Sequence, residues 1–88
     1  MEIMIISAVW CPSCLVMKKI YKQLESDFKD ITFSYLDYDF DEEEISKYNI
    51  SNILPVFIIR KDNKEITRII GEHGKAEYEK VIKEVYEK

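Results

Sequence analysis

Two cysteines stand three positions apart in the stretch Cys11-Pro12-Ser13-Cys14, and the chain has no others. Thiols at this spacing can bind a metal ion, form a permanent crosslink, or open and close a disulfide. A tetrahedral zinc site needs four ligands, and His73 is the only other candidate of the usual kind. Zinc, a copper carrier and two inert core cysteines therefore remain alternatives to a redox pair.

The proline between the cysteines favours the redox interpretation. Pro12 suits the first residue of a helix, because its fixed φ fits there and its missing N–H would have no partner. Cys11 would then cap the helix and face unpaired N–H groups, which favour the thiolate over the thiol. Cys14 would lie one turn further along the same side and be more buried. We expect Cys11 to attack a partner's disulfide and Cys14 to resolve the mixed disulfide that forms.

The apolar pattern predicts the elements that position this pair. An apolar run suggests a strand buried on both faces, and a helical period follows it. The predicted succession is a strand over 3–9, a helix over 12–29, a strand over 31–36, a short helix over 41–48, strands over 53–60 and 65–70, and a helix over 75–87. This β-α-β-α-β-β-α order predicts an α/β fold in which three helices flank a four-stranded mixed sheet.

Length and composition limit the protein to a few classes. The 88 residues are 47% hydrophobic and 34% charged, which fits a single domain over 1–88. We expect a cytoplasmic protein without a membrane partner, because the start lacks signal-peptide features and two neighbouring cysteines cannot staple a secreted domain. A net charge of −4 argues against nucleic acid as a partner. We also expect a monomer.

Several stretches together resemble the thioredoxin superfamily over nearly the whole chain. They are Trp10 followed directly by Cys11–Cys14, the stretch ISKYNISNILPVFIIR (45–60), Gly71 and the order of elements. The resemblance implies a thiol-disulfide oxidoreductase that acts on protein disulfides, needs no cofactor, and receives electrons from a reductase or from glutathione. It also implies that Leu54-Pro55 is a cis-proline loop facing the cysteines, and that Trp10, Pro12, Leu54 and Pro55 bind the substrate.

The chain also departs from its relatives in ways that bear on function. Pro12 directly follows the first cysteine, as in glutaredoxins. The paired glycines with which glutaredoxins hold glutathione are replaced by Gly71-Glu72-His73-Gly74, and Glu72 would repel a carboxylate. Ile5 stands where thioredoxins carry a buried aspartate, so the Cys14 proton must go to water or another group. A glutathione-coupled reductase and a non-enzymatic binding module or metal carrier remain alternatives.

Overall fold

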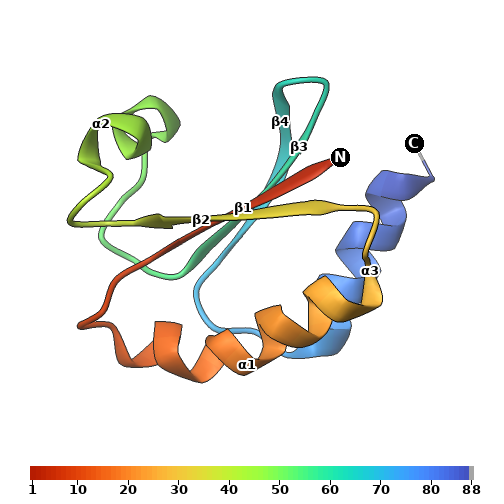
Figure 1. The fold of residues 1–88 in the computed structure, drawn as a ribbon, viewed down its shortest axis with the longest axis horizontal. Helices are drawn as coiled ribbons and strands as arrows, with labels where there is room; N and C mark the ends of the chain where they lie inside the picture. Colours follow the sequence, from red (N-terminus) through yellow and green to blue (C-terminus); the bar gives the residue numbers. More distant parts are fainter. Residues whose placement is uncertain (88) are drawn as a thin grey trace.

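A computed structural model describes residues 1–87, and Figure 1 shows it as a ribbon. Its elements are β1 (Glu2–Ser7), α1 (Pro12–Asp27), β2 (Thr32–Asp37), α2 (Glu42–Ile45), the 3-10 turn η1 (Ser46–Tyr48), β3 (Val56–Lys61), β4 (Lys64–Ile70) and α3 (Lys75–Tyr86). This order confirms the predicted succession, and the short helix predicted over 41–48 consists of α2 followed by η1. Among the helices of these residues, none combines the length and apolar character that a bilayer crossing requires. Residue 88, the last of the predicted domain, lies outside the described residues.

The strands form one mixed sheet in the order β2-β1-β3-β4. Strand β1 runs parallel to β2, whereas β3 is antiparallel to both β1 and β4. Successive side chains of a strand point to opposite faces, and here Ile3 and Ile5 enter one core while Met4 and Ile6 enter the other. Both faces of β1 are covered, which explains its unbroken apolar run. The strand order and directions confirm the predicted four-stranded mixed sheet.

The larger core lies between the sheet and the helices α1 and α3, which cover the same face (Figure 1). At its centre Phe57 of β3 packs against Tyr21 of α1 and Tyr78 of α3, with ring centroids 5.8 and 4.7 Å away. All three side chains are almost completely buried. This packing holds α1 and α3 against the sheet.

The second core covers the opposite face, beneath α2. Ile45 of α2 packs there with apolar side chains of β1 and β3. Cys11, Cys14 and Leu54 belong to the same buried cluster. The start of α1 and the loop before β3 therefore meet inside one core, although about forty residues separate them along the chain.

Two predicted strand boundaries are wrong. The first strand ends at Ser7 and not at Val9, because the Cys11 N–H donates to the Ala8 carbonyl at 3.2 Å and turns the chain off the sheet. The third strand starts at Val56 and not at Ile53, since Pro55 has no N–H to add to the ladder. Val9 and Ile53 are consequently 73% and 58% exposed.

Candidate active site

Cys11 caps the first helix as the sequence predicts. Its backbone is extended, with φ −91° and ψ 111°, and Pro12 is the first helical residue. The Cys14 N–H donates to the Cys11 sulfur at 3.3 Å. The sulfur therefore lies at the N-terminus of α1, where the positive end of the helix dipole faces it.

A second contact joins Cys11 to the loop before β3. The Cys11 thiol donates to the Leu54 carbonyl oxygen at 3.8 Å. The Leu54-Pro55 peptide bond is cis, and the Pro55 carbonyl accepts from the Gly71 N–H at 2.8 Å. The structure therefore places the Leu54-Pro55 loop against the cysteines, as the resemblance implies.

The two cysteines differ in chemistry more than in exposure. Both thiols are free, and Cys11 and Cys14 are 6% and 7% exposed, so the prediction that Cys14 is the more buried residue is wrong. Burial and a hydrogen bond with Cys11 raise the pKa of Cys14 to about 12. At neutral pH Cys14 is consequently a protonated thiol, while the Cys11 sulfur receives an amide hydrogen bond.

Trp10 lies at the surface beside Cys11. It is 55% exposed, its indole Nε1 donates to Asp39 Oδ2 at 2.7 Å, and its ring meets that of Tyr38 edge-on. Asp39 was not among the predicted site residues, because nothing in the sequence distinguishes it from the other acidic residues of 37–44. Pro12 is exposed as well. The substrate-binding role of Trp10 and Pro12 stays a prediction.

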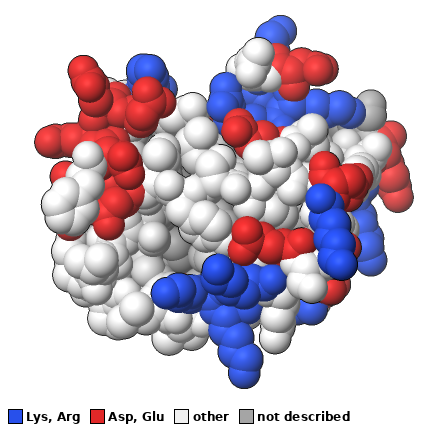
Figure 2. Space-filling model, viewed as in Figure 1, with Lys and Arg blue, Asp and Glu red and all other residues white. Residues whose placement is uncertain are grey.

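Exposed apolar side chains neighbour, along the chain, the residues of the Trp10–Asp39 and Cys11–Leu54 hydrogen bonds. We define the apolar rim as Val9, Trp10, Phe40 and Ile53, which are between 55% and 82% exposed. Val9 precedes Trp10, Phe40 follows the Asp39 that Trp10 binds, and Ile53 precedes the Leu54 that Cys11 contacts. In Figure 2 this end of the molecule is largely uncharged, between acidic side chains near α2 and lysines of α1. Only Trp10 of the rim was a sequence-predicted residue.

The positions of the possible metal ligands bear on the alternative of a metal site. Within residues 1–87, no three His, Cys, Asp or Glu side chains gather into a group that could hold a metal ion. His73, the one further ligand candidate in the sequence analysis, uses both ring nitrogens elsewhere. Nδ1 lies 2.7 Å from the Glu77 carboxylate, and Nε2 lies 2.8 Å from the Ile70 carbonyl.

Ile5 confirms the apolar character of the position beneath the pair. It is 0% exposed, and with Cys14 it lines a cavity of about 260 Å³. It provides no proton acceptor to Cys14. Any acceptor must therefore come from the other side chains of this cavity or from water.

Comparison with known proteins points to one family. The family model described as Thioredoxin matches residues 2–84. Thioredoxin H2-1 of rice is 32% identical over 76 residues, which cover 86% of this chain and 54% of the relative. Thioredoxin F2 of Arabidopsis thaliana is 33% identical over 73 residues, covering 83% and 37%. The chain spans about half the length of the curated relatives it matches, such as rice Thioredoxin H5 at 47%.

Solved structures agree with the sequence comparison. Reduced thioredoxin of Schistosoma mansoni superposes with a TM-score of 0.85 at 31% identity, over 94% of this chain and 76% of that one. Thioredoxin of Fasciola hepatica gives a TM-score of 0.87 at 25% identity, over 94% and 78%.

Proposed function

The chain belongs to the thioredoxin family, and we propose that it exchanges thiols for disulfides with protein partners through Cys11 and Cys14. The observation that carries the proposal is the unequal setting of the two sulfurs. Cys11 accepts an amide hydrogen bond at the start of a helix, and Cys14, one turn further on, keeps its proton because it is desolvated. Cys11 is therefore the attacking sulfur, and Cys14 remains a thiol until the mixed disulfide has formed.

The exchange proceeds in two displacements. The Cys11 thiolate attacks one sulfur of the partner's disulfide, which forms a mixed disulfide and releases the other sulfur as a thiolate that takes up a proton. Cys14 then loses its proton and attacks the Cys11 sulfur, so that the Cys11–Cys14 bond forms and the partner leaves as its second thiolate. The partner gains two electrons and the pair loses them. The reverse order of steps oxidises a dithiol.

The surroundings of Cys11 suit an extended protein segment. The apolar rim can cover the apolar neighbours of the partner's disulfide, and the Leu54-Pro55 loop lies beside the sulfur that must be reached. Leu54 and Pro55 are themselves buried, so contact with the partner would be made by their backbone rather than their side chains. Trp10 would contribute its exposed ring and Pro12 the edge of the helix start.

We assign the electron supply to a reductase in the cytoplasm rather than to glutathione. Glu72 is exposed in the loop from Gly71 to Gly74, where its carboxylate would repel a glutathione carboxylate. Turnover of insulin disulfides with NADPH and a thioredoxin reductase should therefore exceed turnover with glutathione and glutathione reductase. The opposite order would favour the glutaredoxin-like alternative.

The roles of the two cysteines can be tested by trapping. A Cys14→Ser variant cannot resolve the mixed disulfide, so it should accumulate covalent complexes that run as slower bands on non-reducing gels and disappear with dithiothreitol. Cys11→Ser lacks the attacking sulfur and should trap none. Equal trapping by both variants, or by neither, would refute the assignment of roles.

Metal analysis separates the redox proposal from the metal-carrier alternative. Protein purified without chelator should contain far less than one equivalent of zinc or copper and should reduce insulin. A full equivalent of metal together with no insulin reduction would support a carrier.

A further inference from the structure

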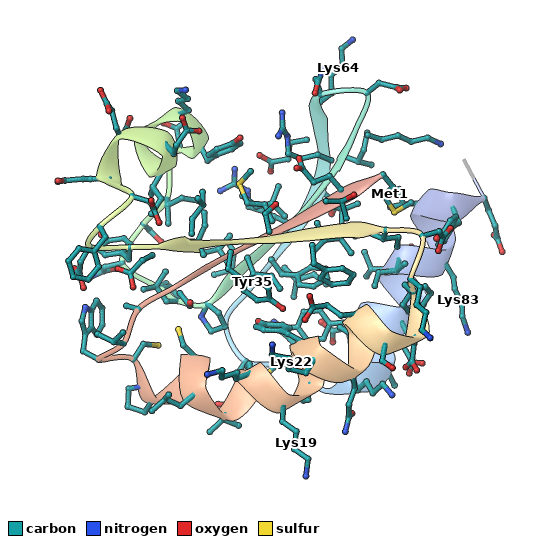
Figure 3. All side chains as sticks on the ribbon, in the orientation of Figure 1. Met1, Lys19, Lys22, Tyr35, Lys64 and Lys83 are labelled. Atoms are coloured by element: carbon teal, nitrogen blue, oxygen red, sulfur yellow. The ribbon has the colours of Figure 1, made fainter. Side chains whose placement is uncertain are left out.

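The cavity beside Cys14 contains polar groups that the exchange described above does not use. It measures about 260 Å³ and lies between α1, β1 and β2. Its polar lining comes from Ser7, Lys18, Tyr21, Lys22, Tyr35 and Asp37. In Figure 3, Tyr35 extends from β2 toward α1, the helix that carries Lys22. The cavity therefore connects the resolving cysteine with a set of ionisable side chains.

Cys14 needs a proton acceptor before it can attack. Only a thiolate displaces a disulfide sulfur, and burial holds Cys14 in its protonated form. Ile5, which lines the cavity with Cys14, has no acceptor atom. The cavity offers this proton a route away from Cys14, and the groups that line it are the candidate acceptors.

The chemistry of the lining leaves one base, because the Ser7 hydroxyl is too weak a base to take a proton from a thiol. Lysine ammonium groups have three donors and no acceptor, which excludes Lys18 and Lys22. Burial raises the pKa of Tyr21 and of Tyr35, so both phenols keep their protons at neutral pH. Among the described residues that line this cavity, Asp37 is the only carboxylate.

Hydrogen bonds hold Asp37 in place at the end of β2. Its Oδ1 accepts from the backbone N–H groups of Asp39 at 2.9 Å and Phe40 at 3.2 Å. Its own N–H donates to Asp41 Oδ2 at 2.8 Å. Asp37 is also paired in register with Ser7 of β1, which lines the same cavity. The carboxylate is therefore fixed at the wall of the cavity before any substrate arrives.

We propose that Asp37 accepts, through water in the cavity, the proton that Cys14 loses when it resolves the mixed disulfide. The inference rests on the proposed function, because it concerns the second displacement of that exchange. The proton passes from Cys14 Sγ to the Asp37 carboxylate and then to solvent, while the departing partner thiolate takes its proton from solvent at the exposed face. A cavity of about 260 Å³ has room for such water, since one molecule occupies roughly 30 Å³.

Other charged and titratable groups face this route from each neighbouring element. Helix α1 contributes Lys18, Tyr21 and Lys22, together with Glu25, which accepts a hydrogen bond from Tyr35 of β2. Asp39 and Asp41 follow β2 in the chain, and the Cys11 sulfur lies beside Cys14. The two ammonium groups stabilise a carboxylate, and the neighbouring carboxylates disfavour it. None of these groups is a carboxylate on the cavity wall, as Asp37 is.

Ellman's reagent, an aromatic disulfide, separates the two displacements. When reduced protein is mixed with one equivalent in a stopped-flow spectrometer, attack by Cys11 releases a first thionitrobenzoate and resolution by Cys14 releases a second. Asp37→Asn keeps an oxygen that can accept the Asp39 and Phe40 N–H groups but removes the base. We expect the first phase to be unchanged and the second phase to slow at least about tenfold at pH 7.

The pH profile distinguishes proton transfer from a structural effect. In Asp37→Asn, hydroxide must replace the carboxylate, so the second phase should accelerate about tenfold per pH unit and approach the parent rate in alkali. Asp37→Ser, whose hydroxyl can also accept a backbone N–H, should behave alike. Glu43→Gln removes the same charge from the exposed α2 segment, off the cavity wall, and should leave both phases unchanged.

Two results would overturn the inference. A second phase that keeps its rate in Asp37→Asn, or that slows equally at every pH, would show that Asp37 is not the acceptor. A second release that persists in Cys14→Ser would instead refute the proposed function, and this inference with it.

Discussion

Selective alkylation of the reduced pair tests the difference between the two sulfurs. Burial and the Cys11 contact raise the pKa of Cys14 from 9.0 to about 12. Alkylation by iodoacetamide consumes only the thiolate, and a difference of this size lowers the thiolate fraction at neutral pH by about 1000-fold. A pulse that fully modifies an ordinary cysteine within minutes should therefore leave Cys14 unmodified.

The assay is intact mass spectrometry of protein quenched after short pulses at pH 7, followed by fragmentation to locate the adduct. We expect a single adduct on Cys11. Protein unfolded in guanidinium should gain two adducts, which shows that reagent is not limiting. In Cys11→Ser, Cys14 should still react slowly, because desolvation is the largest cause of its raised pKa.

Comparable labelling of both cysteines in the folded protein would refute the reasoning. Such a result would mean that Cys14 is not desolvated as the structure shows. The division into an attacking and a resolving sulfur would then have no physical basis, even if the protein exchanged disulfides.

Three further predictions concern stability and binding. Phe57→Ala should lower the free energy of unfolding by about 3–5 kcal/mol in a urea titration, because Phe57 is fully buried, whereas Ile66→Ala, at a site 41% exposed, should cost less than about 1 kcal/mol. The raised pKa of Cys14 stabilises the fold below the ordinary thiol pKa and this contribution disappears as pH rises toward 12, so the urea midpoint should fall less between pH 8 and pH 10 in Cys14→Ala than in the parent. Phe40→Ser should slow insulin reduction about fivefold, equivalent to roughly 1 kcal/mol of lost contact, and leave the reaction with Ellman's reagent unchanged, since Phe40 is 82% exposed on the apolar rim. Equal effects of Phe40→Ser on both substrates would contradict a docking role.

Features that depend on neighbouring residues were predictable. Pro12 beside Cys11 indicated a helix start, and the structure caps α1 there. The apolar period of α1 and α3 indicated which side chains enter the core, and Tyr21 and Tyr78 meet there. The helix start depends on residues less than about two helical turns apart. The apolar face of a helix follows from the spacing of its apolar residues, whichever elements cover that face.

Burial of single residues was predicted less well. The sequence pattern predicted that Val9 lies in a strand and that Cys14 is more buried than Cys11. Val9 is exposed because the chain turns after Ser7, and Cys11 is as buried as Cys14 because the Leu54 loop covers it. The exposed fraction of a side chain depends on neighbours from segments that are distant in the sequence, and a local sequence pattern does not identify those neighbours.

The sequence by itself determined the chemistry of this protein: two thiols one helical turn apart, with a proline that begins the helix between them. Only the tertiary structure decided what surrounds them. Leu54 is 43 positions from Cys11 along the chain, Asp39 is 29 from Trp10, and Asp37 of β2 lines the same cavity as Cys14 of α1. These approaches are set by strand register and helix packing, in which a shift of one residue would turn each side chain to the opposite face.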